Sequence, residues 1–169
     1  MSNPTVLIET PMGEMLVELW ADKAPETVAN FLSYVDEEFY DGLIFHRVIK
    51  NFMIQGGGMD MMMREKKNKA PIKNEARADT PNEAFTIAMA RTMDPHSATS
   101  QFFINVKDND FLNFTAPTAQ GYGYTVFGKV TEGQDVATKI STVRTKNYLG
   151  HGDVPADPIS IISIRRFEV

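Results

Sequence analysis

The stretch from Phe45 to Gly58 places an arginine and a glutamine among large apolar residues, in the order Phe-His-Arg-Val-Ile-Lys-Asn-Phe-Met-Ile-Gln-Gly-Gly-Gly. Side chains alternate between the two faces of a strand, so a strand over residues 52–56 puts Met53 and Gln55 on the same face. A preceding strand adds Arg47 to the same hairpin. The hairpin therefore supplies a cation, an amide and apolar side chains, which is the usual make-up of a small binding site.

A second stretch, over residues 100–106, follows the same alternation. Gln101 and Phe103 share one face of the predicted strand, whereas Phe102 and Ile104 share the opposite face. We expect the face with Phe102 and Ile104 to point into the protein interior. The other face then remains available to extend the site.

The sequence lacks the usual residue sets for covalent or metal-dependent catalysis. His46, His96 and His151 are not spaced as ligand pairs on a helix, and neither a Gly-x-Ser-x-Gly motif nor a cysteine occurs. No Lys-Ser/Thr follows the three glycines at 56–58, so they do not form a phosphate loop. We therefore predict no metal and no cofactor, and we interpret His46 as a hydrogen-bonded structural histidine.

Composition predicts one soluble domain over residues 1–169, which we expect to be a monomer in the cytoplasm. The hydrophobic content of 43% and the charged content of 23% are ordinary for a globular protein. A net charge of −5 gives no general attraction to nucleic acid or to an anionic membrane. No basic region followed by an apolar run opens the chain, and no segment approaches the roughly 20 apolar residues of a membrane span.

Apolar alternation and turn residues predict eight strands, at residues 5–10, 14–20, 44–49, 52–56, 85–90, 101–106, 124–130 and 159–167. A helix is expected from Pro25, which suits a first helical turn, and a shorter helix is expected after Gly133. Mostly local hairpin links favour an antiparallel barrel or a sandwich. The strand count does not choose between these two.

Three longer stretches, at residues 59–82, 109–122 and 145–157, have no clear period and are predicted to be loops. The first contains Met59, Met61, Met62 and Met63, and we interpret it as an ordered surface loop. A methionine copper site is disfavoured because no histidine or cysteine stands nearby. We interpret the basic run at residues 64–69 as solvated rather than phosphate-binding.

Three motifs resemble the cyclophilins, a family of peptidyl-prolyl cis-trans isomerases. They are Phe-His-Arg-Val-Ile at 45–49, Phe-Met-Ile-Gln-Gly-Gly at 52–57 and Ser-Gln-Phe-Phe-Ile at 100–104. The likeness extends from Val6 to the C-terminus and is closest to the short bacterial cytoplasmic type. It implies a mainly β fold, a closed eight-stranded antiparallel barrel capped by two α-helices.

The resemblance also implies an activity, namely rotation about X-Pro bonds in unfolded or flexible protein segments, which assists folding. Arg47 and Gln55 are then the catalytic residues. Arg47 donates to the prolyl nitrogen, and Gln55 holds a substrate carbonyl. The substrate-binding residues carried over by motif are Phe52, Met53, Ala90, Arg91, Thr92, Gln101, Phe103, Phe111, Leu112 and Tyr124.

Three positions depart from the pattern of many eukaryotic relatives. Phe111 replaces a tryptophan whose indole N–H helps to bind cyclosporin, so we expect weak binding of that drug. Tyr124 replaces a pocket histidine, and Arg91 replaces an asparagine. All three changes leave Arg47 in place.

Two other functions stay open at this point. The first is a proline-peptide binding module or chaperone without turnover, although binding alone would not need the donor of Arg47. The second is a barrel that carries a small ligand inside. Large inward residues such as Phe102 argue for a filled interior instead.

Overall fold

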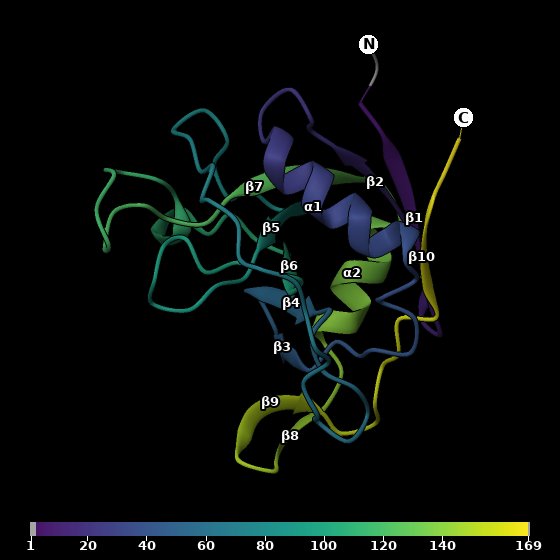
Figure 1. Cartoon of the computed structure of the whole chain (residues 1–169). Helices are drawn as coiled ribbons and strands as arrows, with labels where there is room; N and C mark the ends of the chain where they lie inside the picture. Colours follow the sequence, from purple (N-terminus) through teal and green to yellow (C-terminus); the bar gives the residue numbers. More distant parts are fainter. Residues whose placement is uncertain (1–2, 169) are drawn as a thin grey trace.

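The computed structural model describes residues 3–168, and an antiparallel sheet of eight strands dominates this part of the chain (Figure 1). Its spatial order is β10-β1-β2-β7-β5-β6-β4-β3. The strands are β1 (Thr5–Thr10), β2 (Gly13–Leu19), β3 (Arg47–Ile49), β4 (Met53–Gly56), β5 (Thr86–Met89), β6 (Phe102–Asn105), β7 (Val126–Glu132) and β10 (Ser163–Arg166).

The prediction of a closed barrel is wrong, because the sheet is an open, strongly curled half-barrel. Its edge strands β10 and β3 are not paired with each other. The segments before them meet instead, through one antiparallel bridge between Ile44 and Ser160 and through hydrogen bonds such as Phe45 N–H to the carbonyl of Ile159 (3.0 Å). The strand predicted from residue 44 begins only at Arg47, so no continuous ladder closes the curl.

Two α-helices lie against the curled sheet, as predicted (Figure 1). The first, α1 (Pro25–Asp36), begins at its proline, and the second, α2 (Gln134–Ser141), follows Gly133. A residue far along the chain caps the N-terminus of α1, since the carboxylate of Glu75 accepts a hydrogen bond from Thr27 N–H at 2.7 Å. Apolar side chains of both helices join the strands in one large core cluster, which includes Phe31, Phe102 and Ile140.

A hairpin that we predicted to be a loop forms a second, two-stranded sheet from β8 (Thr145–Tyr148) and β9 (His151–Pro155). Leu149 and Gly150 turn the chain with positive φ angles of 51° and 82°, which is the backbone of a tight hairpin turn. The prediction failed because Leu-Gly is a weak turn signal and because β8 is mostly exposed, without apolar alternation.

The stretch at residues 59–82 is an ordered surface loop, as interpreted from the sequence. Met59 forms an isolated bridge with Glu65, and Ile72 forms another with Ala98. The basic run within it contacts α1 and the turn after it, since Lys69 N–H donates to the hydroxyl of Tyr34 at 2.8 Å and Lys66 Nζ donates to the carbonyl of Phe39 at 2.7 Å. The loop therefore fastens to the helix and to the chain near the site.

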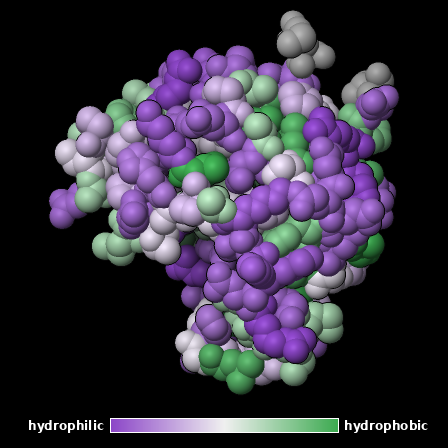
Figure 2. Space-filling model, viewed as in Figure 1, coloured by the Kyte–Doolittle hydropathy of each residue, from purple (hydrophilic) through white to green (hydrophobic). Residues whose placement is uncertain are grey.

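Within residues 3–168, no helix is long and apolar enough to cross a membrane. On the face that Figure 2 shows, hydrophilic residues predominate, and hydrophobic ones form small, separate patches. In the part of the chain that the structure describes, the exposed large hydrophobic residues are Met61, Met62, Met93, Phe111, Leu149, Ile162 and Phe167.

Candidate active site

The register of three neighbouring strands brings the main site residues together. In the antiparallel pairing of β3 with β4, Arg47 lies opposite Gln55, and in the pairing of β4 with β6, Gln55 lies opposite Phe103. Side chains that are directly opposite in adjacent strands share one face of the sheet. Arg47, Gln55 and Phe103 therefore stand in a row on one face, an alignment that the alternation along each strand did not specify by itself.

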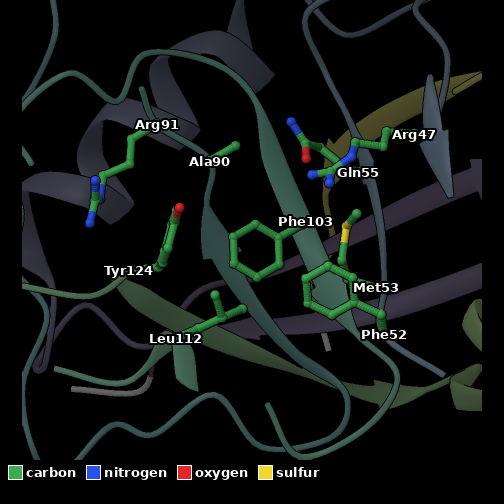
Figure 3. Close-up of a pocket in the computed structure, with 9 residues that line it drawn as sticks. All are labelled: Arg47, Phe52, Met53, Gln55, Ala90, Arg91, Phe103, Leu112 and Tyr124. Atoms are coloured by element: carbon green, nitrogen blue, oxygen red, sulfur yellow. The ribbon is translucent and has the colours of Figure 1, made fainter. Parts of the chain in front are cut away.

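A cavity of about 130 Å³ lies beside this row (Figure 3). The residues that line it are Arg47, Phe52, Met53, Gln55, Ala90, Arg91, Phe103, Leu112 and Tyr124. All nine are among the site residues that the motifs predicted. The sequence resemblance thus identified a set of residues that the fold does bring around one hollow.

The apolar part of the cavity is a small hydrophobic cluster, separate from the large core. Met53 and Phe103 are only 2% and 4% exposed, and Leu112 joins them from a short 3₁₀-helix, η1 (Asp110–Leu112). Ile54 and Phe102, their sequence neighbours, point instead into the large core. The strict alternation of these strands therefore separates the floor of the site from the protein interior.

The two polar groups predicted to be catalytic differ in how they are held. Gln55 Nε2 donates to Oε1 of Gln101 at 3.0 Å, so the amide plane of Gln55 is fixed by its neighbour. Arg47 is exposed and makes no ion pair with another residue of the range 3–168. Its guanidinium keeps its donors available at the edge of the cavity.

Three predicted residues lie outside this lining. Thr92 and Gln101 border a larger neighbouring hollow of about 350 Å³, which shares Gln55, Ala90 and Arg91 with the first. Phe111 is 75% exposed and packs beside Phe52, with ring centroids 5.5 Å apart. Phe111 thus flanks the cavity through Phe52 rather than lining it.

Sequence reasoning missed several residues around the site. The larger hollow is also lined by four loop residues: Glu65, Asn68, Ser97 and Thr99. They come from stretches without a period, so no local pattern placed them near Gln55. The side chain of Asn109 was missed as well, and its Nδ2 donates to the carbonyl of Phe52 at 2.8 Å.

The interpretation of His46 as a hydrogen-bonded histidine is wrong. Its side chain is buried, and Nδ1 has no hydrogen-bond partner among residues 3–168. Burial lowers the pKa of His46, the nearby charges of His151 and Arg47 act in the same direction, and together they bring it from 6.5 to about 4. The imidazole is therefore neutral at physiological pH.

Among residues 3–168, no group of three or more His, Cys, Asp or Glu side chains is arranged to hold a metal ion. The cavity combines an apolar floor, a fixed amide and a free guanidinium. This arrangement can bind a small apolar ring and donate a hydrogen bond beside it.

Comparison with known proteins places this site in a family. Residues 5–166 match the family described as "Cyclophilin type peptidyl-prolyl cis-trans isomerase/CLD". The chain is 56% identical to peptidyl-prolyl cis-trans isomerase cyp18 of Streptomyces antibioticus, over 95% of this chain and 97% of that protein. It is 53% identical to peptidyl-prolyl cis-trans isomerase B of Escherichia coli K12, over 94% and 97% of the two chains.

Solved structures agree with this placement. A crystal structure of a Cryptosporidium parvum cyclophilin-type isomerase in the presence of the dipeptide Ala-Pro superposes with a TM-score of 0.80 at 26% identity. The match covers 98% of this chain and 99% of that one. The chain therefore belongs to the cyclophilin-type peptidyl-prolyl cis-trans isomerases, as an enzyme of the short bacterial type.

Proposed function

We propose that this isomerase acts on X-Pro bonds in unfolded or flexible segments of other proteins, assists their folding, and uses Arg47 as the donor that promotes rotation. The observation that carries the proposal is the row of Arg47, Gln55 and Phe103 along one cavity of about 130 Å³. A proline ring is small and apolar, so it fits a floor built from Phe103 and its neighbours.

The reaction sets a clear energetic requirement. Amide resonance gives rotation about the prolyl bond a barrier of ~20 kcal/mol, and the uncatalysed step takes tens of seconds. Lowering the barrier by about 7 kcal/mol accelerates the rotation about 10⁵-fold. No nucleophile or cofactor is needed, because no covalent bond is broken.

Arg47 supplies a group that can distinguish the transition state from the ground states. In a planar amide the nitrogen lone pair is delocalised and accepts hydrogen bonds poorly. When the bond twists, the nitrogen becomes pyramidal and its lone pair is localised. A hydrogen bond from Arg47 then stabilises the twisted form selectively, as catalysis requires.

Gln55 serves to hold the substrate while one side rotates. Its amide is fixed by Gln101 through the 3.0 Å hydrogen bond, so it presents a polar group of defined orientation. The apolar floor of Met53 and Phe103 grips the ring and excludes water from the amide. Weaker solvation of the planar amide also favours the twisted form.

The relatives support the substrate class. The Cryptosporidium parvum structure was determined in the presence of Ala-Pro, and the bacterial relatives carry the name of prolyl isomerases. We extend this to the present chain as proline-containing segments of proteins. We further propose that it works in the cytoplasm as a monomer, without a cofactor and without nucleic acid or membrane partners.

The role of Arg47 is tested by measuring cis–trans exchange of an Ala-Pro peptide, by NMR or by a protease-coupled assay. We expect Arg47→Ala to lower kcat/KM by about 10²- to 10³-fold, the usual effect of removing one transition-state donor. Arg144→Ala is the matched control, because Arg144 is exposed and lies outside the cavity. We expect the control to keep the wild-type rate and both variants to stay folded.

A wild-type rate in Arg47→Ala would remove the proposed role of the arginine. The same assay decides between enzyme and binding module for the wild-type chain. If the peptide binds but its cis–trans exchange is not accelerated, the chain is a binding module.

We also propose that cyclosporin binds weakly. Phenylalanine at position 111 has no N–H to donate, and its exposed ring packs on Phe52. Loss of one hydrogen bond of ordinary strength lowers the affinity about tenfold. We expect Phe111→Trp to lower the inhibition constant for cyclosporin by about that factor, and an unchanged constant in a parallel titration would contradict this explanation.

A further inference from the structure

The ring of Tyr124 forms one wall of the cavity and has a different neighbour on each side. Phe103 meets it edge-on, with ring centroids 5.6 Å apart and planes at 80°. The guanidinium carbon of Arg91 lies over the ring, 4.4 Å from its centroid. Figure 3 shows the Tyr124 ring between Arg91 and Phe103, with the guanidinium turned away from the centre of the cavity.

Arg91 is itself held in a fixed orientation. Its Nε donates to the carbonyl of Gly123 at 2.9 Å, and its Nη1 donates to the carbonyl of Thr92 at the same distance. A guanidinium is planar, so two such bonds fix the plane of the whole group. The side chain thereby links the loop after β5 with the loop before β7.

The backbone of Tyr124 does not depend on Arg91. Its N–H donates to the carbonyl of Leu112 at 3.1 Å, and the Gly123 carbonyl also accepts from Asn74 Nδ2 at 3.0 Å. Removing the arginine side chain therefore leaves the main chain anchored. What it removes is the support on the outer face of the ring.

We infer that Arg91 is a positioning residue, which holds the Tyr124 ring as a wall of the cavity and so sets the size of the ring that the cavity accepts. This inference rests on the proposed function, because it takes the cavity to be the seat of the proline ring. A wall without support can move outward, so a larger ring gains room while a proline loses contact.

The experiment compares two peptides that differ by one methylene in the ring, Ala-Pro and Ala-pipecolate, with the wild-type chain and Arg91→Ala. We expect kcat/KM for Ala-Pro to fall about three- to fivefold, mainly through KM, as the loss of one cation–π contact predicts. We expect the preference for proline over pipecolate to fall by at least about threefold. A general loss of structure would lower kcat/KM equally for both peptides and leave the preference for proline unchanged.

Two further variants sharpen the comparison. Arg91→Lys keeps a cation that can reach the ring but loses the two fixed bonds, so we expect an intermediate preference. Arg144→Ala, an exposed arginine outside the site, should match the wild type in both measurements. Arg91→Gln replaces Arg91→Ala as the deciding variant if the alanine variant does not fold.

An unchanged preference in Arg91→Ala, or in Arg91→Gln in its place, overturns the inference, and so does a fall in kcat alone with KM unaltered for both peptides. The proposed function fails separately, if the wild-type chain does not accelerate exchange of Ala-Pro at all. In that case NMR titration of both peptides with the same variants measures their relative affinity. A reduced preference for proline in binding then supports the positioning role, and an unchanged one removes it.

Discussion

The imidazole of His46 is buried, whereas Arg47, the next residue in the chain, is exposed to solvent. Its Nδ1 has no hydrogen-bond partner among residues 3–168, and burial is the main reason for its low pKa. Protonating this side chain would place a charge in an apolar environment, next to the charges of Arg47 and His151. The residue therefore links the stability of the fold to pH.

We expect the free energy of unfolding to rise with pH between about 4 and 6.5. In this window the unfolded chain holds a proton on His46, with a pKa of 6.5, while the folded chain, with a pKa of about 4, does not. The contribution of His46 to the free energy of unfolding is fully present above pH 6.5 and is lost as the pH falls. The total loss is about 3 kcal/mol, at about 1.4 kcal/mol for each pKa unit. Urea unfolding at several pH values measures this slope.

The variant His46→Leu provides the comparison, because leucine is apolar and does not titrate. We expect its stability to vary less with pH in this window. Hydrogen bonds from Arg166 and Arg165 lower the pKa of Asp36 and of Asp41, so these carboxylates add their own dependence only below about pH 4. A slope in His46→Leu equal to that of the wild type would rule out His46 as its source.

Residue orientation was predictable where a simple period governs it. Met53 and Phe103 face the site and Ile54 and Phe102 face the core, because strands alternate strictly. The burial of His46 without a partner was not predictable. It depends on what packs across the strand from distant parts of the chain, and β9, which lies near β3, was not recognised as a strand.

At the scale of elements, buried asparagines hold the site together. Asn105, at the end of β6, donates to Asn82 Oδ1 and to Thr86 Oγ1, both at 3.0 Å. Asn109 donates to Asn105 Oδ1 at 2.8 Å and also to the carbonyl of Phe52. A network of this kind satisfies the buried polar groups of the strand ends and the turn before η1. It thereby positions Phe52 without contributing to the cavity itself.

The strands of the main sheet and both helices were predictable, because their apolar residues recur with the period of each element. The ends of the strands were less so, since the strand expected from residue 44 begins at Arg47. The asparagine network was not predictable, because polar residues in irregular stretches carry no period. Its members lie in segments that meet only in the folded chain, and hydrogen bonds between them leave no local pattern.

At the scale of the whole molecule, the open sheet is completed by a seam between its two edges. We use seam for the contact between residues 42–45 and residues 159–161. Gly42 N–H donates to the carbonyl of Ile161 at 2.9 Å, and Phe45 N–H donates to the carbonyl of Ile159 at 3.0 Å. Ile161 is fully buried in the large core, and Ile162, the next residue, is 51% exposed. The seam thus joins the C-terminal segment to the segment that leads into the hairpin of β3 and β4.

We expect Ile161→Ala to lower the free energy of unfolding by about 2–5 kcal/mol, the usual effect of truncating a large buried aliphatic side chain. Ile162→Ala is the matched control, and we expect a change of about 0.5 kcal/mol or less because its side chain faces solvent. Urea unfolding followed by far-ultraviolet circular dichroism measures both. Equal losses in the two variants would show that the seam does not depend on the burial of Ile161.

The same urea titrations, followed by tryptophan fluorescence as well as by circular dichroism, test whether residues 1–169 form one cooperative domain. Trp20, the single tryptophan, packs against the small cluster of Met53 and Phe103, on the opposite side of the sheet from the core that holds Ile161. If the seam and the site belong to one unit, Ile161→Ala shifts the midpoint of tryptophan fluorescence as far as the midpoint of circular dichroism. A fluorescence midpoint that stays at the wild-type value would mean that the face with Met53 and Phe103 unfolds separately from the core behind it.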